Sequence, residues 1–454
     1  MQQRAGGDVD LISTGQASAA VADIAASKGL YDKLSPGPGR PTSQVTDHQR
    51  ARIHRAMIEV VAQQGYSEVK VRDVVRLAGV STRAFYELFD GKEDCFLRTH
   101  ELLVRRAARG LIVSQAGEHG WRRRLNQVQA ALEHVLVREA DAARLVTVDA
   151  YAAGPDALEQ ARRSQATIEA MVGEAFGRAP DGIALPPLMI EGLVTGIARI
   201  LRARFRDGRE QELPRLVGQL GDWALCYPAK SAAELPELDS RSASTKLVSR
   251  TRSIPLGSAD DDRAIILASV AKLTAADGYD SLTIPRIRAK AGVSRRKFNT
   301  HFEGVEDCFL AAMEQRGDEA LAHAGQAQIA GRTWAGGIYR AMAVLSDRVA
   351  GDPILTSVCL ADDFPPGSNG PRSRKRLMVA VTDQLIDSIP IEDHPSDLVK
   401  EISCGAIWEL FHRHVVRSSS QQRPRIAATL SYMALAPIVG PSAAVAAIRR
   451  EQMV

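Results

Sequence analysis

Hydrophobic residues recur along this chain at the three- and four-residue spacing of amphipathic helices. In residues 47–64, Ile53, Met57, Val60 and Val61 fall on one helical face, and a glycine follows where a helix C-cap belongs. Comparable spacing runs through residues 98–115, 122–150, 156–176, 187–206 and 212–226. Alternating apolar and polar residues, the pattern of half-buried strands, are absent. The spacing therefore predicts an all-α fold.

The chain contains one pattern twice. Residues 65–97 read GYSEVKVRDVVRLAGVSTRAFYELFDGKEDCFL and residues 278–310 read GYDSLTIPRIRAKAGVSRRKFNTHFEGVEDCFL, with 15 of 33 aligned residues identical. The second copy lies 213 positions after the first here, and 210 positions after it beyond a short deletion. Further matching pairs are Trp121 with Trp334, Gly154 with Gly367, Glu191 with Glu401, Pro214 with Pro424, and Leu220 with Leu430. A repeat of this length is a duplicated domain rather than a solenoid unit.

Two polar stretches divide the chain. The first 45 residues are rich in Ala, Gly and Ser and end in SPGPGRPTS, which is typical of a flexible arm. The stretch 229–258 has the Ser, Pro and charge content of a linker. A chain of 454 residues is too long for one compact core. It separates into two long segments, about 46–228 and 259–437, one for each repeat.

Each repeat contains two short helices joined by Ala-Gly-Val-Ser, which is the layout of a helix-turn-helix. The predicted pairs are Lys70–Leu77 with Ser81–Phe89, and Thr283–Lys290 with Ser294–Phe302. Glycine permits the left-handed backbone of the tight turn, the valine fills the angle between the helices, and serine caps the second helix. That second helix can enter a DNA major groove with its first residues toward the bases.

These segments resemble the DNA-binding signature of the TetR family. That signature has a long first helix, a capped second helix, Ala-Gly-Val-Ser, a recognition helix ending in Tyr-x-His-Phe, and a fourth helix beginning Lys-Glu-x-Leu. The first repeat matches it at Tyr86, Phe89, Lys92 and Glu93, and the second at Thr283, His301 and Phe302. Substitutions stand at Lys70 and Leu88 in the first repeat, where Thr and His are usual, and at Asn299 and Val305 in the second, where Tyr and Lys are usual.

The resemblance implies a tandem TetR-family transcriptional regulator made of two fused TetR-like units. Each unit is expected to hold a helix-turn-helix head and a helical domain that binds a small ligand and dimerises. The expected order is a flexible arm (1–45), a first DNA-binding domain (46–97), a first ligand and dimerisation domain (98–228), a linker (229–258), a second DNA-binding domain (259–310), a second ligand and dimerisation domain (311–437) and a C-terminal tail (438–454).

Local basic clusters, rather than the overall charge, indicate where DNA is expected to bind. The net charge is only +4, but between Pro285 and Lys297 there are six basic residues and no acid. The expected DNA-binding residues of the first repeat are Lys70, Arg72, Ser81, Thr82, Arg83, Tyr86 and Lys92. Those of the second repeat are Thr283, Arg286, Ser294, Arg295, Arg296, Lys297, Asn299 and His301.

Other chemistry finds little support in the sequence. Five scattered cysteines without a CxxC pair argue against a disulfide framework and for a reducing cytosol. His412 and His414 are two apart, so on a helix they point apart, and no metal site is expected. No catalytic set is recognisable, so we expect neither an enzyme nor a cofactor. No apolar run of eighteen residues and no signal peptide occur, so a cytoplasmic, nucleoid-associated protein without membrane contact is expected.

The leading hypothesis is a sequence-specific regulator of transcription that binds double-stranded DNA, a repressor released by a small-molecule effector of unknown identity. Both heads lie on one chain and would form an intramolecular pseudo-dimer, with further oligomerisation left open. The helices expected to build its four-helix bundle are Leu188–Phe205, Pro214–Leu225, Leu398–Val415 and Pro424–Leu435. The alternative is a ligand-binding receptor or co-regulator that has lost DNA binding in one or both repeats. An enzyme in an all-α scaffold is a weaker third hypothesis.

Overall fold

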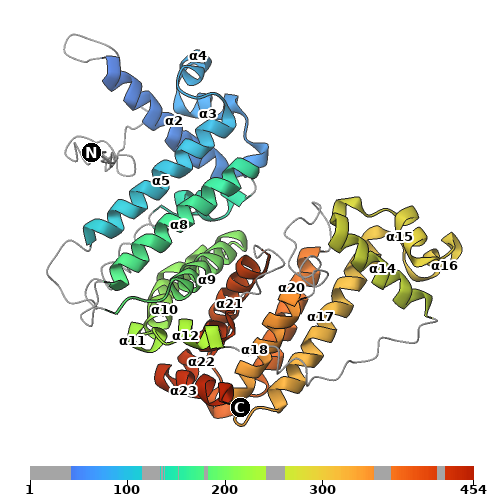
Figure 1. The fold of residues 1–454 in the computed structure, drawn as a ribbon. Helices are drawn as coiled ribbons and strands as arrows, with labels where there is room; N and C mark the ends of the chain where they lie inside the picture. The colour runs from blue at the N-terminus through green and yellow to red at the C-terminus, as the bar shows by residue number, and fades with distance from the viewer. Residues whose placement is uncertain are drawn as a thin grey trace, which may run out of the picture. The chain divides into compact units, whose positions relative to one another are not determined.

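The computed structural model is helical throughout the part that it describes. That part comprises residues 42–114, 133, 136–137, 139–151, 153–177, 183–241, 261–351, 370–416 and 425–453. Within these ranges every regular element is an α-helix or a short 3-10 helix, which confirms the all-α prediction (Figure 1). Most of the expected arm, the second half of the expected linker and the first part of the helix expected over 122–150 lie outside the described residues. No helix in the described ranges is long and apolar enough to cross a membrane.

The chain separates into two compact units. Unit 1 comprises residues 1–171 and 201–219, and unit 2 comprises residues 172–200 and 220–454. Three helices have residues in both units, namely α8 (Pro155–Gly177), α9 (Pro187–Arg206) and α10 (Leu213–Leu225).

Unit 1 holds the first helix-turn-helix and the helices that support it. Its other helices are α2 (Thr42–Gln64), α3 (Val71–Ala78), α4 (Thr82–Tyr86), α5 (Lys92–Ser114) and α7 (Ala140–Thr147). The predicted apolar face of α2 is buried, with Ile53 and Met57 fully enclosed. These side chains pack with Phe85, Phe89 and Phe96 in one hydrophobic core. That core fixes the short helices α3 and α4 against α2 and α5.

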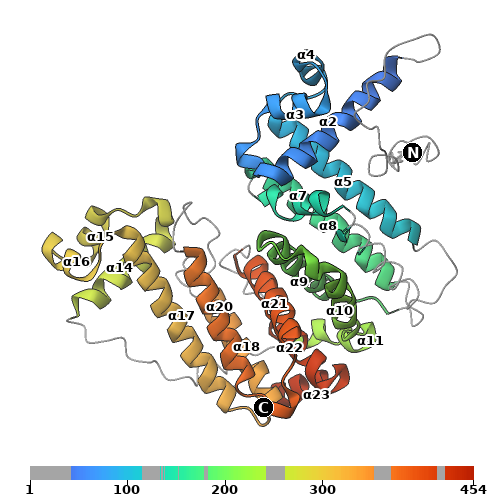
Figure 2. The same cartoon turned by 180° about the vertical axis from the view of Figure 1, so that it is seen from behind.

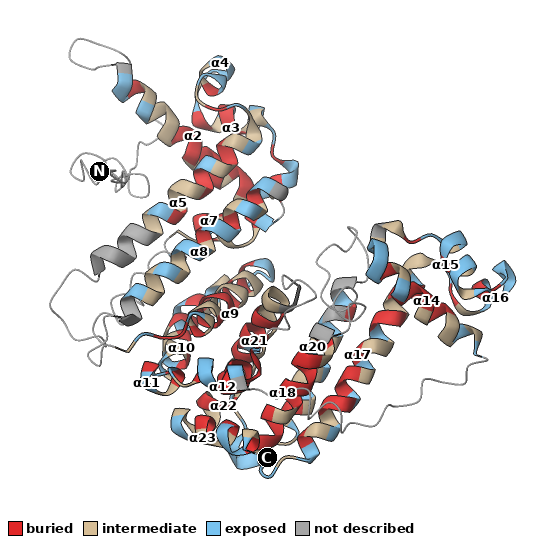
Figure 3. Cartoon of the chain, viewed as in Figure 1, coloured by how far each residue is buried: buried red, intermediate tan, exposed pale blue. Residues whose placement is uncertain are grey.

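Unit 2 contains the second helix-turn-helix and the rest of the second repeat (Figure 2). Its helices are α11 (Ala229–Ala232), α12 (Leu235–Arg241), α14 (Asp262–Asp277), α15 (Ile284–Ala291), α16 (Arg295–His301), α17 (Val305–Ile329), α18 (Trp334–Gly351), α20 (Gly370–Ile386), α21 (Asp397–Val416), α22 (Ala427–Val439) and α23 (Pro441–Gln452). Helix α22 contacts α12, α18, α21 and α23 and is buried along most of its length (Figure 3). It therefore forms the centre of this unit.

The expected linker differs from the structure over its first half, which is helical. Asp239 in α12 is buried and accepts hydrogen bonds from the backbone N–H of Ala428 at 2.7 Å and from the Thr429 hydroxyl at 2.5 Å. A carboxylate at these first N–H groups caps α22 and meets the positive end of its dipole. The polar composition of residues 229–241 thus serves tertiary contacts rather than a flexible connection.

The segment expected as a C-terminal tail is also an ordered helix, α23. Glu451 is buried, accepts a hydrogen bond from Arg340 Nε at 2.5 Å and accepts another from the backbone N–H of Arg332. Gln452 donates to the Leu238 carbonyl at 2.7 Å and to the Tyr339 hydroxyl at 2.9 Å. Helix α23 therefore joins α12, which follows the first repeat, to α18 of the second.

Within unit 2, helix α9 of the first repeat packs closely on α21 of the second. A Cβ atom added at Gly196 would lie 2.8 Å from the Cβ of Ala406, and Arg199 Nη1 lies 3.1 Å from Glu409 Oε1. Ala406 and Glu409 each stand 210 positions after their contact residue, which is the offset of the duplication. Residues at equivalent positions of the two repeats therefore touch each other.

Further contacts surround this pair of helices. Glu191 binds Arg413 at 3.0 Å and His414 at 2.9 Å, and these partners hold the pKa of its carboxyl below the usual range although burial alone would raise it. Trp223 Nε1 donates to the Ser403 hydroxyl at 3.0 Å, and the Tyr227 hydroxyl donates to a backbone carbonyl of α22 at 2.8 Å. His414 thus belongs to a cluster of polar side chains around Glu191.

Unit 1 encloses two histidines where the second repeat has apolar residues. His54 and His100 are almost fully buried, and the equivalent positions 213 residues later hold Leu267 and Met313. The Thr99 hydroxyl donates to a backbone carbonyl, so its oxygen accepts the Nδ1 proton of His54 at 2.7 Å. Burial lowers the pKa of both histidines to about 4, assisted at His54 by neighbouring cations. Both rings are therefore held neutral at neutral pH.

Acid is expected to destabilise unit 1 through these histidines. An unfolded histidine titrates near pH 6.5, so between pH 6.5 and about 4 the unfolded state binds protons that the folded state does not. The free energy of unfolding is highest above this pH window. It falls as the pH drops through the window, by roughly 3 kcal/mol per histidine. Hydrogen exchange of α2 and α5, corrected for intrinsic rates, should show this loss. His54→Leu with His100→Met, the second repeat's residues, should flatten it; an unchanged pH slope in that variant would contradict the assignment.

Candidate DNA-binding heads

Two helix-turn-helix heads carry the residues that the sequence singled out. Head 1 is residues 46–97 and head 2 is residues 259–310. In head 1 the turn between α3 and α4 is at Gly79, whose φ and ψ are 61° and 36°; in head 2 the turn between α15 and α16 is at Gly292, with 69° and 27°. Both glycines are in the left-handed region, which side chains other than glycine rarely adopt. The predicted tight turn is therefore present in both heads.

Capping side chains set the start of each recognition helix. Ser81 Oγ accepts a hydrogen bond from the N–H of Ala84 at 3.1 Å, and Ser294 Oγ accepts one from the N–H of Lys297 at 3.2 Å. Thr283 caps α15 in the same way, whereas Lys70 occupies that position in head 1 without a side-chain cap. Ser81, Ser294 and Thr283 are thus helix caps on the exposed surface of the heads.

The predicted contact residues of head 1 differ in their exposure and in the partners that they already have. Tyr86 is 55% exposed at the end of α4. Arg83 is exposed and pairs with Glu87 one turn along at 2.9 Å, and Arg72 and Thr82 are exposed as well. An exposed pair of this kind costs little to separate, so the Arg83 guanidinium remains open to another anion.

Lys92 has an internal partner. Its Nζ donates to the backbone carbonyl of Tyr66 at 3.2 Å and lies 4.2 Å from the centre of the Tyr66 ring. This cation–π contact joins the start of α5 to the segment after α2. The expected phosphate contact of Lys92 would therefore compete with a contact inside head 1.

Head 2 presents a more basic surface. Arg295, Arg296 and Asn299 are exposed on α16 and form no ion pair with any residue in the described part of the chain. Lys297 pairs with Asp262 at 3.0 Å, and Arg286 pairs with Asp277 at 2.6 Å. His301 is half-buried beside the ring of the following phenylalanine.

The charge difference between the heads is large over equivalent positions. Residues 285–297 of head 2 hold six basic and no acidic residues, and residues 72–84 of head 1 hold three basic and one acidic residue. The aromatic core under both surfaces is the same in kind, since Phe85 and Phe298 are both fully buried. The heads share a fold and differ in the surface that it presents.

One residue that supports head 1 was not among those expected from the sequence. Arg52 of α2 is buried and donates from Nε to the Ala78 carbonyl at 2.8 Å and from Nη2 to the Gly79 carbonyl at 2.6 Å. It satisfies carbonyl groups at the end of α3 that a helix leaves unpaired. The equivalent residue of head 2 is Ile265, so no pattern shared by the repeats pointed to it.

Comparison with known proteins agrees with this geometry. The model of the family "Bacterial regulatory proteins, tetR family" matches residues 53–99 and again residues 266–312, one match in each head. No curated protein matches the chain. A solved structure of the fatty acid degradation regulator FadR from Bacillus halodurans is 15% identical, with 38% of this chain and 96% of that chain covered and a TM-score of 0.35, a likeness too weak to indicate function. The chain therefore carries two segments that match the DNA-binding domain of that family, one in each head.

Proposed function

We propose that this protein regulates transcription by binding double-stranded DNA through both heads of one chain, and that a small-molecule effector releases it. The observation that carries the proposal is the presence of two capped helix-turn-helix heads whose recognition helices expose cations. It acts as a repressor in the cytoplasm, on DNA, without catalysing a reaction. Selection of bound sequences from a random DNA pool, together with the mass of the complex, tests this directly.

In the proposed complex the first residues of α4 and α16 read base edges. Thr82 and Arg83 occupy that place in head 1, and Arg295 and Arg296 in head 2. Phosphates are contacted by the flanking groups, which are Lys70, Arg72, Ser81, Tyr86 and Lys92 in head 1 and Thr283, Arg286, Ser294, Lys297, Asn299 and His301 in head 2. Contacts of both kinds fix the register of a head on the duplex.

The two repeats pair within the chain as a pseudo-dimer. In a two-fold interface a residue on the axis meets its own equivalent, as Gly196 meets Ala406 and Arg199 meets Glu409. A homodimer of the first repeat would place Arg199 against a second Arg199, and one of the second repeat would oppose two copies of Glu409. Unlike charges at this place therefore favour pairing of the two different repeats.

The effector acts by shifting a population. A ligand that binds more tightly to an arrangement in which the heads no longer match successive major grooves favours that arrangement. Its ratio of affinities for the two states sets the extent of release.

The first prediction is that the heads read unlike half-sites. Arg296→Ala should weaken binding at one half-site by about 1–3 kcal/mol if Arg296 reads a base, and Tyr86→Ala should weaken the other. Footprinting and the salt dependence of binding measure both effects. Arg450→Ala removes the same charge from the exposed end of α23 and serves as the control. If Arg296→Ala leaves the footprint and the salt dependence unchanged, head 2 does not read DNA. That result would favour the alternative in which the second repeat has lost DNA binding.

A second prediction concerns the spacing of the half-sites. Two heads of one pseudo-dimer reach half-sites about one helical turn, 34–36 Å, apart. Inserting about five base pairs between them turns one half-site to the opposite face of the duplex and should abolish tight binding. Electrophoretic shift at fixed salt measures the change. Insertion of a full turn is the control for added length, and equal affinity on all three sites would show that one head suffices.

A third prediction concerns the pairing of the repeats. Cleavage at a protease site placed between Arg241 and Asp261 should leave the halves associated, since α9 and α21 remain packed. Arg199→Glu places like charges together and should raise the dissociation constant of the halves roughly tenfold. Exchanging both charges, with Arg199→Glu and Glu409→Arg, should recover most of that loss. Sedimentation velocity gives the dissociation constants; halves that separate without any substitution would refute the pseudo-dimer.

A further inference from the structure

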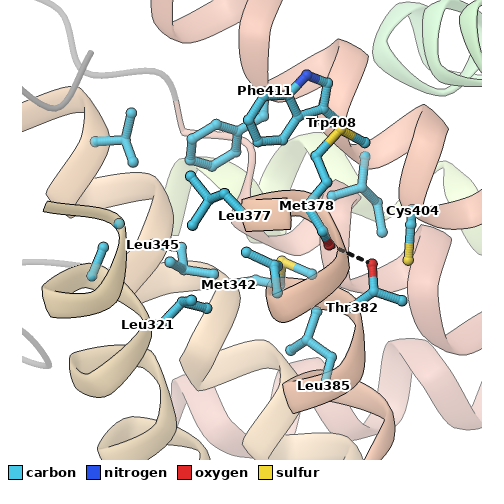
Figure 4. A pocket seen from close by; sticks show the side chains of 15 residues that line it. Leu321, Met342, Leu345, Leu377, Met378, Thr382, Leu385, Cys404, Trp408 and Phe411 are labelled. Carbon is cyan, nitrogen blue, oxygen red and sulfur yellow. Dashed lines mark hydrogen bonds between the residues drawn. The ribbon is translucent and has the colours of Figure 1, made fainter. Parts of the chain in front are cut away.

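An apolar cavity lies within unit 2, among helices α17, α18, α20 and α21. It is lined by fifteen residues, with Leu321 and Met342 on one side, Leu377 in the middle, and Trp408 and Phe411 on the other (Figure 4). The space that the centre of a water molecule can occupy inside it is about 80 Å³. This volume is several times the roughly 10–15 Å³ that one water needs. The cavity is therefore large enough to admit a ligand rather than a single solvent molecule.

None of the described residues that line the cavity has a charged side chain. The Thr382 hydroxyl donates to the Met378 carbonyl of its own helix at 2.8 Å, so its proton is already used (Figure 4). Cys404 and Trp408 also carry polar groups, a thiol and an indole N–H. Burial raises the pKa of the Cys404 thiol, which stays protonated and neutral at neutral pH. Outside the lining, Arg199 contacts the Met378 sulfur at 3.3 Å, and its guanidinium is paired with Glu409. An ionised ligand would find no counter-charge among these described lining residues.

Small and flexible residues shape the cavity wall. A Cβ atom added at Gly317 would lie 2.7 Å from Leu377, so any side chain at this position would push Leu377 toward the cavity or displace α20. Met342 and Met378 are unbranched and adapt to the shape of an apolar guest. The first repeat has Val104 in place of Gly317 and Ala198 in place of Trp408. The duplication has therefore given the second repeat its own lining.

We propose that this cavity binds an uncharged, predominantly apolar molecule, and that this molecule belongs to the chemical class of the effector. The inference rests on the proposed function only for the effector role, since the binding itself follows from the lining. An anion or cation of the same hydrocarbon length binds much more weakly, because entry would bury a charge without a partner.

Calorimetric titration of the full chain with 1-octanol, octanoate and octylammonium tests the class of ligand. The alcohol should bind at least about tenfold more tightly than either ion. Absence of binding by 1-octanol would overturn the proposal, as would an ion that binds as tightly as the alcohol.

Two variants taken from the first repeat locate the binding. Gly317→Val should weaken 1-octanol binding about tenfold, because the added methyl groups fill the cavity. Ala322→Val puts the same side chain on the exposed face of α17 and controls for the effect of valine on the helix. Trp408→Ala enlarges the cavity and should shift the binding preference to a longer alcohol. This variant can still locate the binding site if Gly317→Val does not fold. Octanol affinity unchanged in both cavity variants would place the binding elsewhere and overturn the assignment.

DNA binding by the unsubstituted chain, with and without 1-octanol, separates the two proposals. Bound octanol that lowers operator affinity supports both the ligand class and the effector role. Octanol that binds the cavity and leaves operator affinity unchanged supports the ligand class but refutes its effector role. Failure to bind DNA at all would refute the proposed function and leave the calorimetric result standing.

Discussion

The close approach of α9 and α21 is the constraint on which the rest of unit 2 depends. Gly196 and Ala406 are small enough for the two backbones to meet, and Gly192 leaves room for Met433 of α22 in the same way. A larger residue at any of these positions would separate the helices and open the core around Trp223. Small residues at the contact thus fix the distance between α9 and α21, and the surrounding ion pairs fix the register of these two helices.

This packing draws the chain ends of both repeats into one core. Helix α22 is apolar nearly all round, so it is stable only when other elements cover every face. The segment after the first repeat supplies α12, with Asp239 as the cap of α22, and the end of the chain supplies α23, with Glu451 buried against Arg340. Breaking either buried contact on one side alone would leave an unpaired charge, so the second repeat depends on chain that follows the first.

The features that the sequence predicted are those that local rules determine. Helical periodicity located the core face of α2, and a left-handed turn with a capped helix requires the residues found at Gly79 and Ser81. The expected linker and tail were wrong in part because α12 and α23 owe their order to distant partners. Arg52 and the cavity were missed for a related reason: a buried arginine and a gap among four helices become recognisable only when the helices are packed.

Having both repeats on one chain also changes the effect of an amino-acid substitution. In a homodimer each substitution occurs twice, so a charge on the axis meets itself and a change in one head changes both. Here Arg199 faces Glu409, head 1 keeps His54 in its core where head 2 has Leu267, and Gly317 in the cavity wall corresponds to Val104. The first difference pairs unlike residues at equivalent positions of the two repeats, and the other two lie inside one repeat, where it can vary while the packing of the other is unaffected. One chain can therefore hold two unlike helix-turn-helix heads and a cavity with its own lining, which identical subunits cannot provide.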